Sequence, residues 1–140
     1  MPSSMSQIRE ALAESMLAVD GLRVFDVLPA QPPIPCAIVA PDTVEYDSSF
    51  GNVARVAGLT RYEFIITVLV GSMSERAAQH RLDGYVSPSG DQSIKAAVES
   101  DRTLGGVVSD VRVAGMRDYV SFPNGDSTFL GAEFVAQVMA

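Results

Sequence analysis

The chain has 140 residues, of which 47% are hydrophobic and 19% charged, with a mean hydropathy of +0.19 and a formal net charge of −7. These values are typical of one folded domain over residues 1–140, large enough to bury a core without disulfides or structural metals. Tight binding to nucleic acid phosphate depends on clustered Lys and Arg, so the acidic balance argues against it. No apolar run approaches the roughly 20 residues of a membrane-spanning helix, and the N-terminus lacks the basic region of a secretory signal, so synthesis in the cytoplasm is expected.

The first predicted element is an amphipathic helix that begins after Ser4. Ser4 and Gln7 have the spacing of a capping box, and Asp20-Gly21 supplies a stop because Gly readily adopts the left-handed conformation. The apolar stripe of this helix repeats at helical spacing and consists of Ile8, Leu12, Met16 and Val19.

Two short strands separated by prolines are predicted next. Residues 23–27 form the first strand, and the prolines between residues 29 and 35 impose an extended connector. Residues 36–40 form the second strand, which Pro41 is expected to end, with residues 43–46 as a candidate continuation. The single cysteine, Cys36, has no partner for an internal disulfide and is expected to pack as a small hydrophobe.

Residues 47–60 show neither strand nor helix periodicity and are predicted to form a long mobile loop. Loops of this length are uncommon in compact domains and tend to be either functional or disordered. The loop is therefore the first candidate for partner contacts. Its candidate interface residues are Phe50, Val53, Arg55 and Val56.

The most regular strand pattern follows over residues 62–70. Tyr62, Phe64, Ile66, Val68 and Val70 alternate onto one face. The opposite face is interrupted by polar side chains, as expected of a strand with one dry side.

Two helices are predicted between this strand and the C-terminal third. Ser72 and Glu75 have capping-box spacing for a helix that buries Ala78, Leu82 and Tyr85 and stops before Pro88. Asp91 is the expected N-cap of a shorter helix. That helix should bury Ile94, Ala97 and Val98, expose Lys95 and Glu99, and end through Leu104-Gly105-Gly106.

The C-terminal third is predicted to contain strands that end in a β-hairpin. Val107, Val111 and Val113 can share one face, and Pro123-Asn124-Gly125-Asp126 is a tight-turn signal. The buried face of the last strand is Leu130, Ala132, Phe134, Ala136 and Val138. The element order indicates an α+β fold with a mostly antiparallel sheet, an N-terminal helix and two central helices packed on it, and a final hairpin.

Enzymatic chemistry is not expected from these residues. His80 is the only histidine and is predicted to be exposed, and no Cys or His pair has the spacing of zinc ligands. Asp101, Asp110 and Asp118 are interpreted as solvent-facing charges rather than metal ligands. Gly105-Gly106 follows a helix instead of preceding one, the wrong geometry for a phosphate cradle, so neither a cofactor nor a metal is expected.

Two segments carry a resemblance to a known family. Residues 90–101, GDQSIKAAVESD, together with residues 103–113, TLGGVVSDVRV, are similar to the tail terminator proteins of long-tailed bacteriophages of the actinobacteriophage type. The closing residues 130–135, LGAEFV, are similar to them as well. Each segment also has a purely structural explanation, since the small faces of Ala96 and Ala97 allow close helix packing and Leu104 fills the helix end.

The resemblance implies a non-catalytic virion protein. Such a subunit forms a hexameric ring on the head-proximal end of the tail tube, stops tube polymerisation and provides the head-joining surface. The implied partners are other copies of the chain, the tail tube protein and a head-completion or neck protein. The genome would pass through the lumen without specific binding, and assembly would take place in the host cytoplasm.

Closed rings need heterologous contacts, for which residues 47–60 and the edge of the C-terminal hairpin are the candidates. Six copies would carry a formal charge of −42, six times −7, and an acidic lumen would repel DNA phosphates. The alternatives are a different ring protein of the head–tail neck and, from another class, a small ligand-binding or enzymatic α+β domain.

Overall fold

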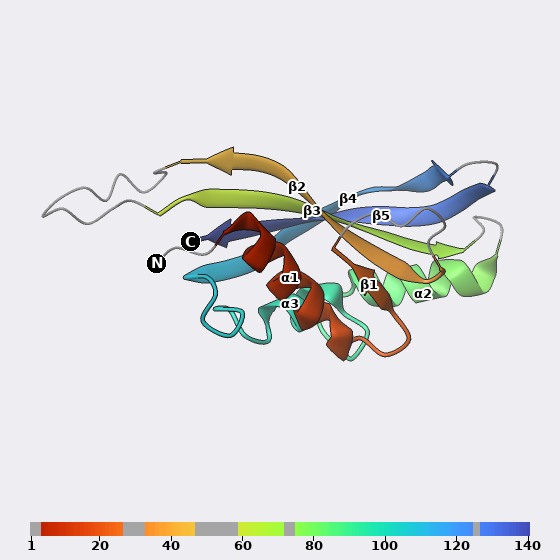
Figure 1. Cartoon of the computed structure of the whole chain (residues 1–140). Coiled ribbons are helices and arrows are strands. Elements are labelled where there is room, and N and C mark those ends of the chain that lie inside the picture. The colour runs from red at the N-terminus through yellow and green to blue at the C-terminus, as the bar shows by residue number, and fades with distance from the viewer. Residues whose placement is uncertain (1–3, 27–32, 47–58, 72–74, 125–126) are drawn as a thin grey trace, which may run out of the picture.

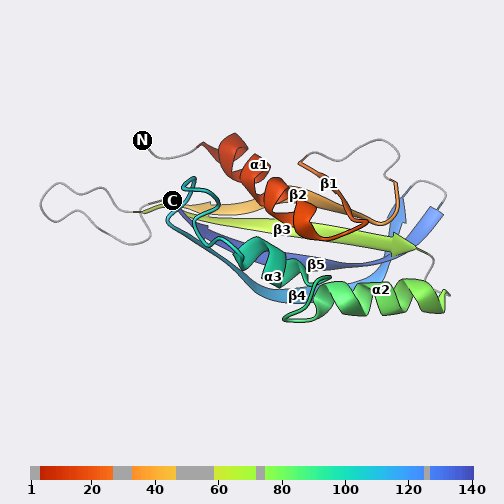
Figure 2. The same cartoon turned by 90° about the horizontal axis from the view of Figure 1, so that it is seen from below.

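The computed structural model describes residues 4–26, 33–46, 59–71, 75–124 and 127–140. These residues form two layers, a five-stranded sheet and a layer of helices on one of its faces (Figure 1). A view from below shows α1, α2 and α3 spread over the same face (Figure 2). The elements are α1 (Met5–Ser15), the 3-10 helix η1 (Met16–Ala18), β1 (Arg23–Phe25), β2 (Cys36–Glu45), β3 (Arg61–Gly71), α2 (Arg76–Val86), α3 (Ile94–Glu99), β4 (Asp110–Asn124) and β5 (Ser127–Met139).

The strand order in the sheet is β1-β2-β3-β5-β4. β1 pairs with β2 in parallel, and all other neighbouring strands are antiparallel. β5 therefore lies inside the sheet, and β4 is the terminal strand. The predicted α+β class, the element order and the final hairpin are confirmed.

One large core lies between the helices and the sheet. From the sheet, Phe64, Ile66 and Val68 of β3 and the alternate residues of β5 point into it, and all of them are buried. From the helical layer come Ile8, Leu12, Met16, Leu82, Tyr85, Ile94 and Val98. The apolar stripes predicted for all three helices are thus the faces that the helices bury.

The start of the chain follows the prediction closely. Ser4 is the N-cap of α1, its hydroxyl accepts a hydrogen bond from the Gln7 amide at 3.2 Å, and the Gln7 side chain accepts one from the Ser4 amide at 2.8 Å. The helix tightens into η1 before Gly21, which has a φ of +79°. The predicted capping box and glycine stop are both confirmed.

The prediction that Pro41 ends the second strand is wrong. β2 runs to Glu45, and its pairing with β3 shifts by one residue between Pro41 and Thr43. Among the described residues, β1 pairs with β2 only at residues 36–38. Pro41 therefore lies on an outer edge and beside a bulge, the two places where a strand tolerates proline.

Both predicted N-caps of the central helices are wrong. The N-cap of α2 is Glu75, which forms no side-chain capping bond, and Ser72 lies outside the described residues. The N-cap of α3 is Ser93, whose hydroxyl accepts from the Ala96 amide at 3.0 Å and donates to the Ser87 carbonyl at 2.5 Å. Ser93 is buried whereas Asp91 is exposed, so the nearer hydroxyl takes the capping position.

The start of β4 also differs from the prediction. Val107 belongs to the turn that follows α3, and Val108 is buried in its place. β4 begins at Asp110 and continues for 15 residues, with pairing irregularities between Val113 and Gly115 and between Arg117 and Val120. Each bulge adds a residue to β4 and so changes which of the following side chains point into the core. The prediction takes the alternation of inward and outward side chains to be continuous.

Candidate functional site

The four predicted interface residues, Phe50, Val53, Arg55 and Val56, lie outside the described residues, as do residues 47–58 of the predicted loop. The last two residues of that range are described. Thr60 exchanges backbone hydrogen bonds with Ala140, at 2.8 Å and 3.0 Å. Thr60 therefore extends the pairing of β3 with the C-terminal strand, and the predicted loop is at least one residue too long.

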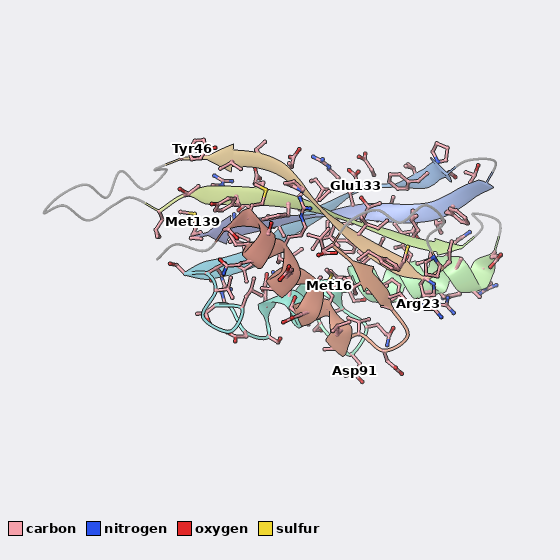
Figure 3. The ribbon with its side chains drawn as sticks, in the orientation of Figure 1. Met16, Arg23, Tyr46, Asp91, Glu133 and Met139 are labelled. Carbon is pink, nitrogen blue, oxygen red and sulfur yellow. The ribbon has the colours of Figure 1, made fainter. Side chains whose placement is uncertain are left out.

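The most organised polar surface lies on the face of the sheet that no described helix covers, here called the helix-free face. It is formed by the alternate residues Arg61, Glu63, Ile65, Thr67 and Leu69 of β3 and their cross-strand partners. Figure 3 shows Glu133 of β5 on this side and Met16 in the helical layer. The polar side chains of this face are exposed or half-buried, whereas Ile38, Ile65 and Leu69 on the same face are buried.

A row of hydrogen bonds crosses four strands of the helix-free face. Thr43 of β2 donates its hydroxyl to Glu63 Oε2 at 2.9 Å, and Gln137 Nε2 of β5 donates to Glu63 Oε1 at 3.3 Å. Arg112 Nε of β4 then donates to Gln137 Oε1 at 2.9 Å. This polar row, Thr43–Glu63–Gln137–Arg112, follows the strand register and ties β2, β3, β5 and β4 together.

Glu63 is the acceptor at the centre of the polar row. Hydrogen bonds from Thr43 and Gln137 stabilise its charged form, and Arg61, 3.7 Å away, adds to the effect. Together they lower the pKa of Glu63 below its ordinary value. The carboxylate is therefore a structural anion at neutral pH, with both oxygens engaged.

A second charged pair lies further along the helix-free face. Arg117 Nε of β4 contacts Glu133 Oε1 of β5 at 3.1 Å, and the two residues are register partners. Between this pair and the polar row, Ile65 and Val135 are paired across β3 and β5. Polar and apolar rows thus alternate along the strands.

One end of the helix-free face is apolar. Cys36, Ile38 and Leu69 are buried there, with Phe25, Phe122 and Phe129 packed against them. Burial raises the pKa of the Cys36 thiol, and a hydrogen bond with the Leu69 backbone only partly offsets this. Cys36 packs as a small hydrophobe, as predicted.

The outer edge of β4 is the second surface of interest, because it is the free edge of the predicted hairpin. Its first part is occupied by carboxylates. Asp110 Oδ1 accepts from the Val111 amide at 2.9 Å, and Glu99 Oε2 of α3 accepts from the Val113 amide at 2.8 Å. Burial opposes ionisation of Glu99, but hydrogen bonds from Lys95 and the Val113 amide outweigh it, so the pKa of Glu99 is lowered.

Residues considered for chemistry are dispersed. His80 is exposed on α2 and accepts a hydrogen bond from Arg76 Nε at 3.2 Å. Asp101 accepts from Thr103 and from the Gly105 amide and so shapes the turn after α3. Within the described ranges, no three His, Cys, Asp or Glu side chains are grouped so that they could hold a metal ion.

The described surface also contains a hollow beside the polar row, and the helices are short. In the part of the chain that the structure covers, no helix has the length and apolar character needed to cross a membrane. A hollow lined by Arg61, Asp110, Arg112 and Gln137 lies beside the polar row, across β3, β5 and β4, where β4 begins and β5 ends.

No protein-family model matches this sequence, and no curated protein is significantly similar to it.

Sequence reasoning could not identify the polar row. Glu63 and Thr67 interrupt the apolar pattern of β3, which is a signal that one face is polar. Pairing Glu63 with Gln137, however, requires β5 to lie between β3 and β4, and neither strand order nor register can be read from alternation alone.

Proposed function

We propose that the chain is a structural subunit of a bacteriophage tail, namely the tail terminator. Six copies close into a ring on the head-proximal end of the tail tube, stop its growth and present the surface to which a head-completion or neck protein binds. The ring works by shape complementarity, and the genome passes through its lumen without specific contacts.

The observation that carries the proposal is the spatial relation of the two resembling segments. Residues 90–113 form α3, the following turn and the start of β4, and residues 130–135 lie in β5, the neighbour of β4. Ala97 and Val98 of the first segment share one core with Ala132 and Phe134 of the second. The two segments, although distant in the sequence, thus pack against one another. This supports the proposal, because segments that determine a shared fold are expected to lie in one core.

The two edges of the sheet support a head-to-tail contact. One edge is β4, and the other is β2 with the short β1 beside it, so the edges differ in length and in sequence. A contact that joins two different patches is heterologous, the type that generates closed rings when the rotation closes. Between these edges, the polar row and the Arg117–Glu133 pair of the helix-free face supply polar surface for a neighbour or for the tube.

The contact residues remain those predicted from the sequence, residues 47–60 and the hairpin edge. Because the amides of Val111 and Val113 already have acceptors, pairing of a neighbour with β4 is restricted to residues after Val113. Deleting Ser48 to Gly58 tests the other candidate. Unchanged ring assembly after this deletion would remove that segment from the interface.

Electron microscopy of phage that lack the gene tests the proposal. Loss of a terminator produces overlong tails without heads, and a plasmid copy of the gene restores the tail length. Heads that lose DNA and accept no tails, beside tails of normal length, would instead identify the chain as a head-completion protein of the neck.

A further inference from the structure

Four charged residues lie along the outer edge of β4 and alternate in sign. In addition to the bond between Glu99 and the Val113 amide, Lys95 Nζ donates to Glu99 Oε2 at 2.6 Å and to the Val113 carbonyl at 3.3 Å. Both backbone groups of Val113 are therefore occupied by side chains of α3. An edge strand ordinarily offers such groups to another strand.

The other two residues of the cluster, Arg102 and Asp110, lie at the preceding outward-facing amide of β4, that of Val111. Arg102 binds Asp110 through two hydrogen bonds, Nε to Oδ1 at 2.8 Å and Nη2 to Oδ2 at 3.2 Å. Asp110 Oδ1 also accepts from the Val111 amide, and Arg102 Nη1 lies 4.0 Å from Glu99 Oε1. The cations thus hold both carboxylates against the strand edge.

We infer that Lys95, Glu99, Arg102 and Asp110 form an edge lock that prevents a second copy of the chain from adding a strand at Val111–Val113. An incoming carbonyl would have to displace Glu99, whose side chain is only 16% exposed. A hydrogen bond to a carboxylate is about twice as strong as one between neutral groups, so the exchange is unfavourable. It would also leave a partly desolvated charge without its amide donor.

The strand directions explain why a second copy is the partner to be excluded. β2 and β4 run in opposite directions, since three antiparallel pairings separate them. The outer side of β2 is paired with β1 only at residues 36–38 among the described residues. Copies set side by side in one orientation would therefore bring β4 antiparallel to the remainder of β2.

Head-to-tail strand pairing of this kind produces open filaments when the rotation does not close. The edge lock closes Val111–Val113 to this pairing and leaves the residues of β4 after Val113 for the head-to-tail contact proposed above. Its role in ring closure rests on the proposed function, whereas the lock itself is a property of the isolated chain.

Hydrogen exchange of single amides tests the lock directly. In Glu99→Ala the Val113 amide loses its acceptor, and its exchange should accelerate at least about tenfold in the folded protein. Glu99→Gln keeps an acceptor oxygen and serves as the matched control, with exchange within about threefold of wild type. The Phe134 amide in β5 reports on the integrity of the sheet and should not change in either variant.

Sedimentation velocity over a range of concentrations tests the consequence. The double variant Lys95→Ala/Glu99→Ala should form an open-ended series of sizes, whereas the wild type and Glu99→Gln should not. Unchanged Val113 exchange in Glu99→Ala, or identical size distributions in all variants, would overturn the inference. If Glu99→Ala fails to fold, the variant Arg102→Gln is used instead, because it weakens the contact that holds Asp110 at the strand edge. Exchange of the Val111 amide, which donates to Asp110, is then the quantity measured, and it should accelerate.

These measurements separate the inference from the proposed function. Faster Val113 exchange with open-ended association supports the lock even if the chain proves not to be a terminator. Normal exchange in a protein that still caps tail tubes rejects the lock and leaves the terminator proposal intact.

Discussion

Gly131 shows how tightly the helix-free face is packed at its apolar end. A Cβ atom at this position would lie 2.4 Å from the Val68 carbonyl oxygen, 2.9 Å from Leu69 Cδ2 and 3.0 Å from Phe122 Cδ2. The nearest of these atoms belongs to the backbone of the paired strand, so it cannot move without separating β3 from β5.

Gly131→Ala should therefore destabilise the protein by about 1–3 kcal/mol, the usual range for overpacking. Gly115→Ala in β4 is the matched control, because nothing lies within 4 Å of a Cβ atom there, and its free energy of unfolding should change little. Urea denaturation measures both. Equal stability of the two variants would show that the sheet relaxes at Gly131.

The acidic residues of the polar row and the edge lock make stability depend on pH. The pKa values of Glu63, Glu99 and Asp110 are lowered in the folded state, by hydrogen bonds at Glu63 and Asp110 and against the effect of burial at Glu99. A lowered pKa contributes stability that is present above the ordinary value, near pH 4, and is lost as the pH falls through the folded-state value.

We therefore expect the free energy of unfolding to be steady near neutral pH and to decrease below about pH 4.5. Glu99→Gln should show a shallower decrease, because one of the groups with a lowered pKa is gone. Urea titrations at pH 7, 5, 4 and 3 measure the slope. A Glu99→Gln slope as steep as that of the wild type would contradict the assignment.

At the scale of elements, α3 depends on its N-cap. Ser93 is buried and its hydroxyl both accepts from the Ala96 amide and donates to the Ser87 carbonyl, so it joins the start of α3 to the end of α2. Loss of an N-cap hydroxyl costs about 1 kcal/mol, and an unsatisfied buried carbonyl adds to that.

Ser93→Ala should accordingly lower the free energy of unfolding by roughly 1–3 kcal/mol. Asp91→Ala, at the position that the sequence pattern favours for the cap, should change it by less than about 0.5 kcal/mol. Thermal and urea unfolding measure the difference. A larger loss in Asp91→Ala would restore Asp91 as the cap of α3.

The elements also show where sequence reasoning succeeds and where it stops. The helical stripes and the core-facing residues of β3 and β5 form continuous apolar faces, and they are predicted correctly. The prediction that β3 has one dry side is only partly right, because Ile65 and Leu69 are buried on its other face. Caps and strand ends depend on competing local partners, which explains the errors at Asp91, Pro41 and Val107. The polar row depends on strand order and register, which are tertiary properties without a local signal.

At the scale of the whole molecule, carboxylates are present both on the helix-free face and in the helical layer. Among the described residues, strand register places four basic and four acidic residues on the helix-free face: Arg23, Arg61, Arg112, Arg117, Glu45, Glu63, Asp110 and Glu133. Two further carboxylates in the strand bulges, Asp42 and Asp118, act on Arg117 of this face. Exposed carboxylates such as Glu10 and Glu14 of α1 lie in the helical layer. If the proposed ring has an acidic lumen, the α1 carboxylates are one set of side chains that can be tested for lining it.

The exposed carboxylates of α1 give the lumen hypothesis a specific test. Glu10→Lys/Glu14→Lys should slow DNA ejection from assembled phage, because new cations would attract the passing phosphates. Glu45→Lys on the helix-free face is the control and should leave the rate unchanged. Ejection at the wild-type rate in the α1 double variant would count against a lumen lined by helices.

Under the proposed function, copies of this chain close into a ring that ends the growth of a tube. The most direct measurement mixes the purified chain with polymerising tail tube protein and follows tube length by negative-stain electron microscopy. We expect a ring-shaped cap at one end of each tube and tubes that stop lengthening as the chain is added. A chain that stays monomeric beside tubes that continue to grow would contradict it.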